Sequence, residues 1–189
     1  MDSREHEYLR LFKTVCKQIN SSLDVGEVLR TITANAVRML EVKGCTIFLI
    51  DNQSNTLEVS ATYGLSDTYI RKGPLEADRS FADCLDGEWV HVRDVLADPR
   101  VQYADAARQE GIEAILSVPM IVKDRIIGVL RIYMTRARDF SVLDNEFISG
   151  LAEIGSIGIE NARMHSHLQA DYERLIADVH EWFEVRHSV

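Results

Sequence analysis

Hydrophobic residues recur at helical spacing near both ends of the chain. On the charged segment Glu5–Asn20 they lie 4, 3 and 4 residues apart, which predicts an amphipathic helix. Asp24 is a suitable N-cap for a second helix, which is expected to run to about Leu40. Ser141 is expected to cap a long final helix, and because no proline follows Pro119, that helix can continue into the tail.

Between these helices, short apolar or alternating segments bounded by turn residues are typical of strands. The predicted strands are Cys45–Ile50, Thr56–Tyr63, Trp89–Val92, Ile112–Ile121 and Ile126–Thr135. The stretch from Gly64 to Gly111 is expected to be irregular, with short helical pieces near Phe81–Leu85 and Tyr103–Glu110. This order of elements predicts an α+β domain with an antiparallel sheet.

Strand alternation gives the predicted sheet two faces of different chemistry. One face is wholly aliphatic and suits packing against helices, whereas the other is apolar with a few polar groups, as in small-ligand pockets. A three-residue loop over 123–125 would place Ser117 opposite Arg131 on the mixed face. We expect residues of the irregular stretch to close a pocket there. The expected ligand-binding residues are Thr46, Phe48, Phe81, Tyr103, Ile115, Ser117, Arg131 and Tyr133.

Arg131 is the most informative residue of that face, because a buried guanidinium in an apolar strand needs a partner. One interpretation pairs it with Glu113, Asp98 or another carboxylate of the chain. A second extends the charged head group to solvent while the stem stays buried. The third is an anionic ligand in the pocket, bound by Arg131 with hydroxyl groups from Ser117 and Tyr133.

The C-terminal tail carries an apolar stripe with the 4-3-4-3 spacing of a coiled-coil seam. So short a seam is not stable alone, but it continues the predicted final helix. The stripe either folds back onto the chain's own N-terminal helix or packs against a second copy, and we expect a homodimer. The expected interface combines both ends of the chain: Tyr8, Phe12, Val15, Ile19, Leu168, Tyr172, Leu175, Val179 and Trp182.

Composition narrows the functional classes. The 189 residues carry a net charge of −9, which disfavours nucleic acid as a partner. The longest stretch without a charged residue has nine residues, so no membrane-spanning segment is expected. Three scattered cysteines favour a reducing cytoplasm over a disulfide framework or a zinc site. Enzyme motifs are absent, so we expect no enzyme, assign no catalytic residue or metal, and leave any cofactor unidentified.

Several segments, in this order of elements, resemble the GAF domain family: Trp89–Val95 with Asp98–Arg100, Gly111–Met120, Ile126–Leu130, and Phe140–Ser141 before the final helix. The resemblance covers about Leu9 to Leu168. It implies a PAS-related, six-stranded antiparallel sheet with a helical bundle on one face and a ligand pocket with short helices and loops on the other. We therefore expect a GAF domain over residues 1–168, which includes the N-terminal dimer helix, and a coiled-coil-like helical extension over 169–189.

The resemblance also implies a regulatory role in signal transduction, in which a small ligand changes the geometry of dimer helices that an output domain reads. Bilin-binding members carry a cysteine in an N-terminal extension or before the Ser117-Val118-Pro119 strand, and cyclic-nucleotide-binding members carry an Asn-Lys pair. Here no cysteine follows Cys84 and no Asn-Lys pair occurs. Two alternatives remain: an enzyme similar to free methionine sulfoxide reductases, for which Cys84 lacks an evident resolving partner, and a domain that only dimerises.

Overall fold

The computed structural model describes residues 3–21, 24–51, 56–76 and 80–186. The helices in this part of the chain are α1 (Ser3–Ser21), α2 (Val25–Leu40), α3 (Asp67–Ile70), α5 (Ala82–Leu85), α6 (Ala104–Gln109) and α7 (Val142–Arg186). The strands are β1 (Gly44–Asp51), β2 (Thr56–Tyr63), β3 (Val90–Val92), β4 (Ala114–Val122) and β5 (Arg125–Met134). Every strand and long helix that the hydrophobic pattern predicts is present, and α3 is an addition.

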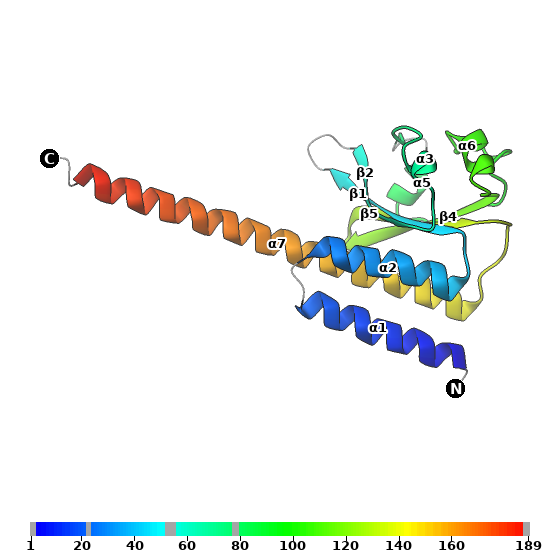
Figure 1. Ribbon diagram of the computed structural model, residues 1–189, viewed down its shortest axis with the longest axis horizontal. Coiled ribbons are helices and arrows are strands. Elements are labelled where there is room, and N and C mark those ends of the chain that lie inside the picture. The colour runs from blue at the N-terminus through cyan, green and yellow to red at the C-terminus, as the bar shows by residue number, and fades with distance from the viewer. Residues whose placement is uncertain (1–2, 22–23, 52–55, 77–79, 187–189) are drawn as a thin grey trace.

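The strands form one antiparallel sheet in the order β2-β1-β5-β4-β3 (Figure 1). The six strands implied by the resemblance are wrong for the described residues, which form a sheet of five. Between β3 and β4, the carboxylates of Asp94 and Asp98 accept the backbone N–H groups of Leu96 and Arg100, each two residues on. Such local hydrogen bonds compete with strand pairing and favour turns.

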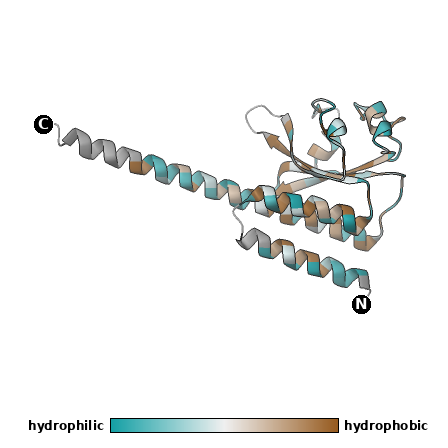
Figure 2. Cartoon of the chain, viewed as in Figure 1, coloured by the Kyte–Doolittle hydropathy of each residue, from teal (hydrophilic) through white to brown (hydrophobic). Residues whose placement is uncertain are grey.

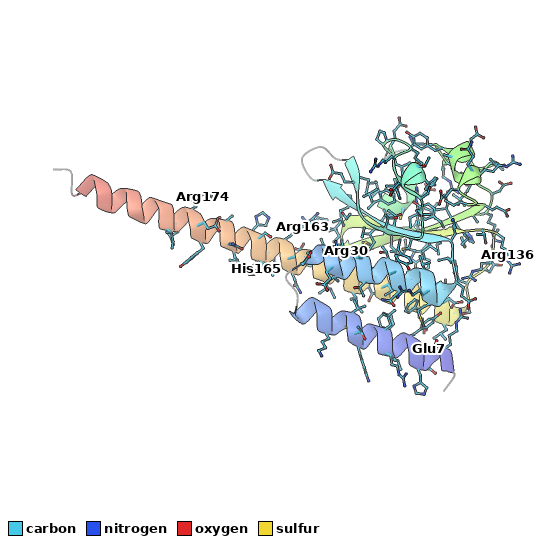
Figure 3. The ribbon with its side chains drawn as sticks, viewed as in Figure 1. Glu7, Arg30, Arg136, Arg163, His165 and Arg174 are labelled. Atoms are coloured by element: carbon cyan, nitrogen blue, oxygen red, sulfur yellow. The ribbon has the colours of Figure 1, made fainter. Side chains whose placement is uncertain are left out.

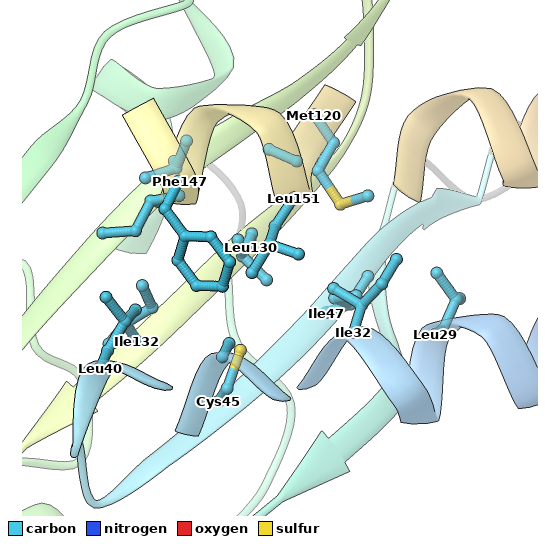
Figure 4. Close-up of a cluster of buried hydrophobic side chains, with 14 of the residues drawn as sticks. Leu29, Ile32, Leu40, Cys45, Ile47, Met120, Leu130, Ile132, Phe147 and Leu151 are labelled. Atoms are coloured by element: carbon cyan, nitrogen blue, oxygen red, sulfur yellow. The ribbon is translucent and has the colours of Figure 1, made fainter. Parts of the chain in front are cut away.

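Helices α2 and α7 cover the aliphatic face of the sheet, and α1 packs outside them (Figure 1). In Figure 2, hydrophobic residues are frequent where these helices meet the sheet. The core side chains come from both layers, and burying their apolar surface is the main stabilising contribution. Figure 4 shows this cluster, which includes Leu29, Ile32, Leu40, Cys45, Ile47, Met120, Leu130, Ile132, Phe147 and Leu151.

The helix starts follow the capping residues in the sequence. Asp24 accepts the N–H of Glu27 at 3.2 Å, as expected of an N-cap. At α7 the Ser141 hydroxyl accepts the N–H of Asp144 at 3.1 Å, and the Asp144 carboxylate accepts the N–H of Ser141 at 3.2 Å. This reciprocal pair is a capping box with Asp in the third position. It confirms Ser141 as the start of a single, 45-residue final helix.

The β4–β5 hairpin reaches its predicted register by a different turn. Val122 pairs directly with Arg125, so the loop contains two residues, Lys123 and Asp124, with φ of 47° and 62°. Positive φ at both central positions is typical of a type I′ turn. An irregularity between Met120 and Ile121 shifts the register by one, and this shift restores the predicted pairing of Ser117 with Arg131 and Ile115 with Tyr133.

Helix α1 packs against the first turns of α7 within the same chain. The Tyr8 ring stacks on Phe147 with centroids 3.9 Å apart, and its hydroxyl donates to Asp144 at 2.7 Å. Val15 is fully buried, and Phe12 is partly buried against Phe147. The structure therefore places Tyr8, Phe12 and Val15, which we predicted at a dimer interface, in the core of one chain. The Ile19 side chain lies outside the described residues.

Beyond the sheet, α7 continues alone (Figure 1). Its predicted seam residues Leu168, Tyr172 and Leu175 are 69%, 64% and 61% exposed. Arg163, His165 and Arg174 lie along the same part of the helix (Figure 3). The stripe does not fold back onto α1, so its apolar side chains have no partner within the described residues. The side chains of Val179 and Trp182 fall outside those residues.

Candidate functional site

A small cavity lies on the mixed face of the sheet, under the segments that carry α3, α5 and α6 (Figure 1). Its volume is about 20 Å³, which holds about one water-sized group. The sheet contributes Val90, Val92, Ile115, Ser117 and Arg131. The segments above it, here named the cover, contribute Tyr69, Lys72, Leu75, Ser80, Arg100, Val101, Gln102 and Tyr103. The cavity is thus mostly apolar, with several convergent polar groups.

Arg131 lies at the floor of this cavity, held by uncharged groups. Its Nε–H donates to the Ser117 hydroxyl at 3.0 Å, because the hairpin register places these residues opposite each other. Its Nη2 donates to the backbone carbonyl of Ser80 in the cover at 2.7 Å. The guanidinium carbon also lies 3.8 Å from the centre of the Phe81 ring, a cation–π contact.

The carboxylates that we considered as partners of Arg131 are engaged or exposed elsewhere. Asp98 pairs with Arg100 at 2.6 Å, and Glu113 is exposed. The Arg131 side chain is 7% exposed, so its head group does not reach solvent. Pairing with Asp98 or Glu113 and extension to solvent are therefore wrong, and no carboxylate within residues 3–21, 24–51, 56–76 and 80–186 forms an ion pair with Arg131. Asp78, another carboxylate of the chain, lies outside the described residues. Burial lowers the Arg131 pKa, but an arginine stays charged in a protein.

Lys72 adds a second cation to the same cavity. Its ammonium donates to the Tyr69 carbonyl at 3.1 Å and lies 3.9 Å from the centre of the Tyr69 ring. Burial, and then the nearby charge of Arg131, lower the pKa of Lys72 to about 8. The Glu110 carboxylate opposes this shift, but it is itself bound by Ser66. Two neighbouring cations thus face one small cavity.

Hydrogen bonds between its own segments hold the cover closed. The Tyr103 hydroxyl donates to the Pro74 carbonyl at 3.0 Å. The Gln102 side-chain oxygen accepts from the Glu76 N–H at 2.8 Å and from the Ser80 hydroxyl at 2.9 Å. Two of these hydrogen bonds are exposed and the one between Ser80 and Gln102 is partly buried, and each is worth about 1 kcal/mol. A ligand larger than the present cavity therefore has to displace them to enter.

The structure brings the predicted site residues to one side of the sheet. Half of them line the cavity: Tyr103, Ile115, Ser117 and Arg131. The others are buried on the same side without lining it: Thr46, Phe48, Phe81 and Tyr133. The lining residues that were not predicted include the polar residues Lys72, Ser80 and Gln102, which lie in segments without any periodicity. The ligand-binding role of all these residues stays a prediction.

Two of the three cysteines are buried. Cys84 is buried near Arg131, and burial raises the pKa of its thiol to about 12. Burial also raises the pKa of Cys45, so both thiols are protonated at neutral pH and weak nucleophiles. Among the described residues, no group of His, Cys, Asp and Glu side chains is arranged to hold a metal ion. None of the described helices has the length and apolar composition needed to cross a membrane.

The chain thus folds into an antiparallel sheet with helices on one face and a small, covered cavity on the other. Residues 22–160 match the sequence model of the GAF domain. The chain therefore belongs to the GAF domain family. No curated protein matches the chain significantly.

Solved structures share this fold at low sequence identity. The GAF domain of a phosphoenolpyruvate-protein phosphotransferase from Coxiella burnetii is 18% identical with a TM-score of 0.73, over 87% of this chain and 99% of that one. A free methionine-R-sulfoxide reductase from Neisseria meningitidis is 18% identical with a TM-score of 0.69, over 87% and 95%. A segment of a methyl-accepting chemotaxis protein is 25% identical with a TM-score of 0.64, over 79% and 97%. These neighbours thus include part of a chemotaxis protein and a reductase.

Proposed function

We propose that this protein is a cytoplasmic sensory GAF module that binds a small ligand in the cavity above Arg131 and signals through paired α7 helices. The observation that carries the proposal is that β4 and β5 have the cavity on one side and α7 on the other. Ser117 faces the cavity, whereas its neighbours Leu116 and Val118 belong to the core cluster that also contains Phe147 and Leu151 of α7. Any shift of β4 on ligand binding therefore displaces side chains that pack on α7.

A tightly packed core supports transmission of such a shift. A Cβ atom on Gly155 of α7 would lie 2.9 Å from the Met120 side chain of β4. Packing this close leaves little room for strand and helix to move independently. A ligand can shift the arrangement only by its different affinity for two states of the module. The closed cover and an open cover are the two states that we propose.

The proposed output is the geometry of a parallel or antiparallel pair of α7 helices. In this proposal, the exposed seam of α7 packs against α7 of a second copy of this chain. The seam has coiled-coil spacing and continues a helix already anchored in the domain, so pairing requires no new helix nucleation. An isolated helix would leave Leu168, Tyr172 and Leu175 in water, and their burial between two copies is favourable.

Deleting residues 171–189 tests the assembly. The sheet, the cavity and the contacts of α1 with α7 all lie before residue 171, so we expect a folded domain that dimerises more weakly. Sedimentation equilibrium of the full chain and of residues 1–170 measures the change, and circular dichroism checks the fold. A monomer in both proteins, or an unchanged dimer after deletion, would contradict the proposal.

A ligand is sought separately by native mass spectrometry of the full chain. We expect a mass above that of the polypeptide, lost when the protein is unfolded. Conversion of free methionine sulfoxide by the purified protein with a thiol reductant would instead favour the enzyme alternative. Failure to retain or bind any small molecule, together with a stable dimer, would favour a domain that only dimerises.

A further inference from the structure

We propose that the ligand of this cavity carries a carboxylate, which Arg131 and Lys72 bind together. The inference rests on the proposed function, because it names the chemical class that the pocket accepts. Both residues line the same cavity, one from β5 in the floor and one from the cover just after α3. A carboxylate between them would receive charge-assisted hydrogen bonds from two directions.

The charge of the cavity favours an anionic ligand. A buried guanidinium is costly without a counterion, and the described residues provide none for Arg131. The other cation of the cavity, Arg100, already has two carboxylate partners, Asp98 at 2.6 Å and Asp83 at 2.9 Å. Arg131 and Lys72 differ from Arg100 because neither forms an ion pair with a described residue. The cavity therefore concentrates positive charge that a bound anion would neutralise.

The present hydrogen bonds of Arg131 also favour a carboxylate. A guanidinium has five N–H donors in a planar fork that matches a carboxylate. At present one of them binds the Ser80 carbonyl, an uncharged oxygen that comes from the cover rather than from the sheet. A carboxylate oxygen is a stronger acceptor than a peptide carbonyl. Ligand binding would therefore replace Ser80 at Arg131 and release one contact that keeps the cover closed.

Size and polarity also favour a carboxylate. The cavity of about 20 Å³ holds about one water-sized group, so a carboxylate, which is smaller than a phosphate, requires less movement of the cover. The remaining lining is largely apolar, with Leu75, Val90, Val92, Val101 and Ile115. We therefore expect the carboxylate to be attached to a short apolar body, which occupies the space gained when the cover moves.

The experiment compares small carboxylates with their neutral amides on the full chain. Propionate and isobutyrate are titrated against propionamide and isobutyramide by thermal melting and calorimetry, with sodium chloride keeping the ionic strength constant. Concentrations reach about 100 mM, because ligands of so few atoms bind weakly. The variants are Arg131→Met and Lys72→Met. Arg125→Met, at the exposed start of β5, and Arg71→Met, exposed beside Lys72, remove one charge each as matched controls.

We expect the carboxylates, but not the amides, to raise the melting temperature of the wild type and of both control variants. In Arg131→Met the affinity should fall about 10- to 100-fold, the loss of a charge-assisted hydrogen bond. Lys72→Met should weaken binding to a smaller extent, because its ammonium is partly exposed. Equal responses to amides, unchanged affinity in Arg131→Met, binding of phosphate instead, or no response to any carboxylate would each overturn the inference.

These outcomes separate the inference from the proposed function. A neutral molecule found by native mass spectrometry, together with no carboxylate response, would refute the carboxylate and leave a ligand-binding sensory module. No small molecule by either method would refute both. Arg131→Met stays informative only if folded, so its circular dichroism and melting curve are measured first. If it does not fold, Ser117→Ala removes the hydroxyl that orients Arg131, and it should likewise weaken carboxylate binding.

Discussion

At the residue scale, the cavity is organised around Arg131, a charge for which the described residues supply no counterion. Ser117 and Ser80 satisfy part of the Arg131 guanidinium, and Phe81 covers one of its faces. Neutral hydrogen bonds and a cation–π contact offset only part of the cost of removing this charge from water. A side chain kept at such a cost, next to a cavity, is a candidate for ligand binding rather than for stability.

Arg131→Met should leave the domain folded and change the free energy of unfolding by about 1–2 kcal/mol at most. Methionine suits the apolar strand, and the hydrogen-bond partners left behind are a serine hydroxyl and a peptide carbonyl. Urea unfolding of the wild type and the variant measures the difference. A loss of about 3–5 kcal/mol would instead mean that a carboxylate outside the described residues had lost its partner.

Lys72→Met should stabilise the ligand-free domain at neutral pH. The pKa of Lys72 is about 8 in the folded chain against 10.5 in the reference state, so the unfolded chain holds more protons between these values. The free energy of unfolding of the wild type therefore rises with pH from about 8 to 10.5 through this group. The groups facing Lys72 are Arg131 on β5, Glu110 after α6 and Tyr69 on α3.

At pH 7, Lys72→Met should raise the free energy of unfolding by about 1 kcal/mol, after allowance for the partial exposure of the ammonium. This gain in stability should shrink as the pH rises from about 8 to 10.5. Urea unfolding at several pH values measures it, with Arg71→Met as the control that lacks this pH dependence. An advantage that stays constant with pH would show that packing, not the charge of Lys72, is responsible.

At the scale of elements, the sheet and long helices could be predicted because their periodicity is strong. The mixed face was identified correctly from alternation alone, since one residue of error would have exchanged the two faces. The β4–β5 loop was predicted one residue too long, and the register survived because the irregularity at Met120 compensates for the shorter turn. Neither Lys123 nor Asp124 is a glycine, so the sequence gives little sign of a type I′ turn.

The cover could not be predicted to the same degree. The polar residues of the cover line the cavity because hydrogen bonds between loops hold them there. One example is the bond between the side chains of Gln102 and Ser80. Loop contacts of this kind have no repeat in the sequence. The sixth strand was inferred from resemblance only, and the described residues form five strands. Periodicity thus predicted the floor of the candidate site but not the cover.

The hairpin turn offers a test at this scale. Asp124→Gly should raise the free energy of unfolding by about 0.5–1 kcal/mol, because glycine adopts positive φ without the steric cost that a side chain brings. Asp124 has φ of 62°. Asp124→Val is the matched opposite and should be destabilising, since a β-branched side chain disfavours this region. Equal stability of the two variants would argue against the two-residue turn.

At the scale of the whole molecule, α7 connects the N-terminal helix, the sheet and the exposed seam. Its first turns bind α1 through Tyr8 and Phe147, its middle packs on β4, and its last turns carry the exposed seam. The same helix therefore contacts the back of the cavity's floor and the surface that we propose for pairing. Within the described residues, Tyr8 of α1 stacks on Phe147 and donates to Asp144, whereas the exposed seam residues lie on α7.

Leu175→Glu tests whether this seam pairs with a second copy. Leu175 is 61% exposed in the single chain, so the substitution should not affect the fold of the domain. In a dimer it would place two like charges in an apolar seam, and we expect dimerisation to weaken at least about tenfold. Ala170→Glu adds the same charge to an exposed position on the opposite side of the helix, and there dimerisation should be unchanged. Sedimentation equilibrium at several protein concentrations measures both. Equal weakening by the two substitutions would show that net charge, not the seam, controls assembly, and no weakening by Leu175→Glu would refute pairing through α7.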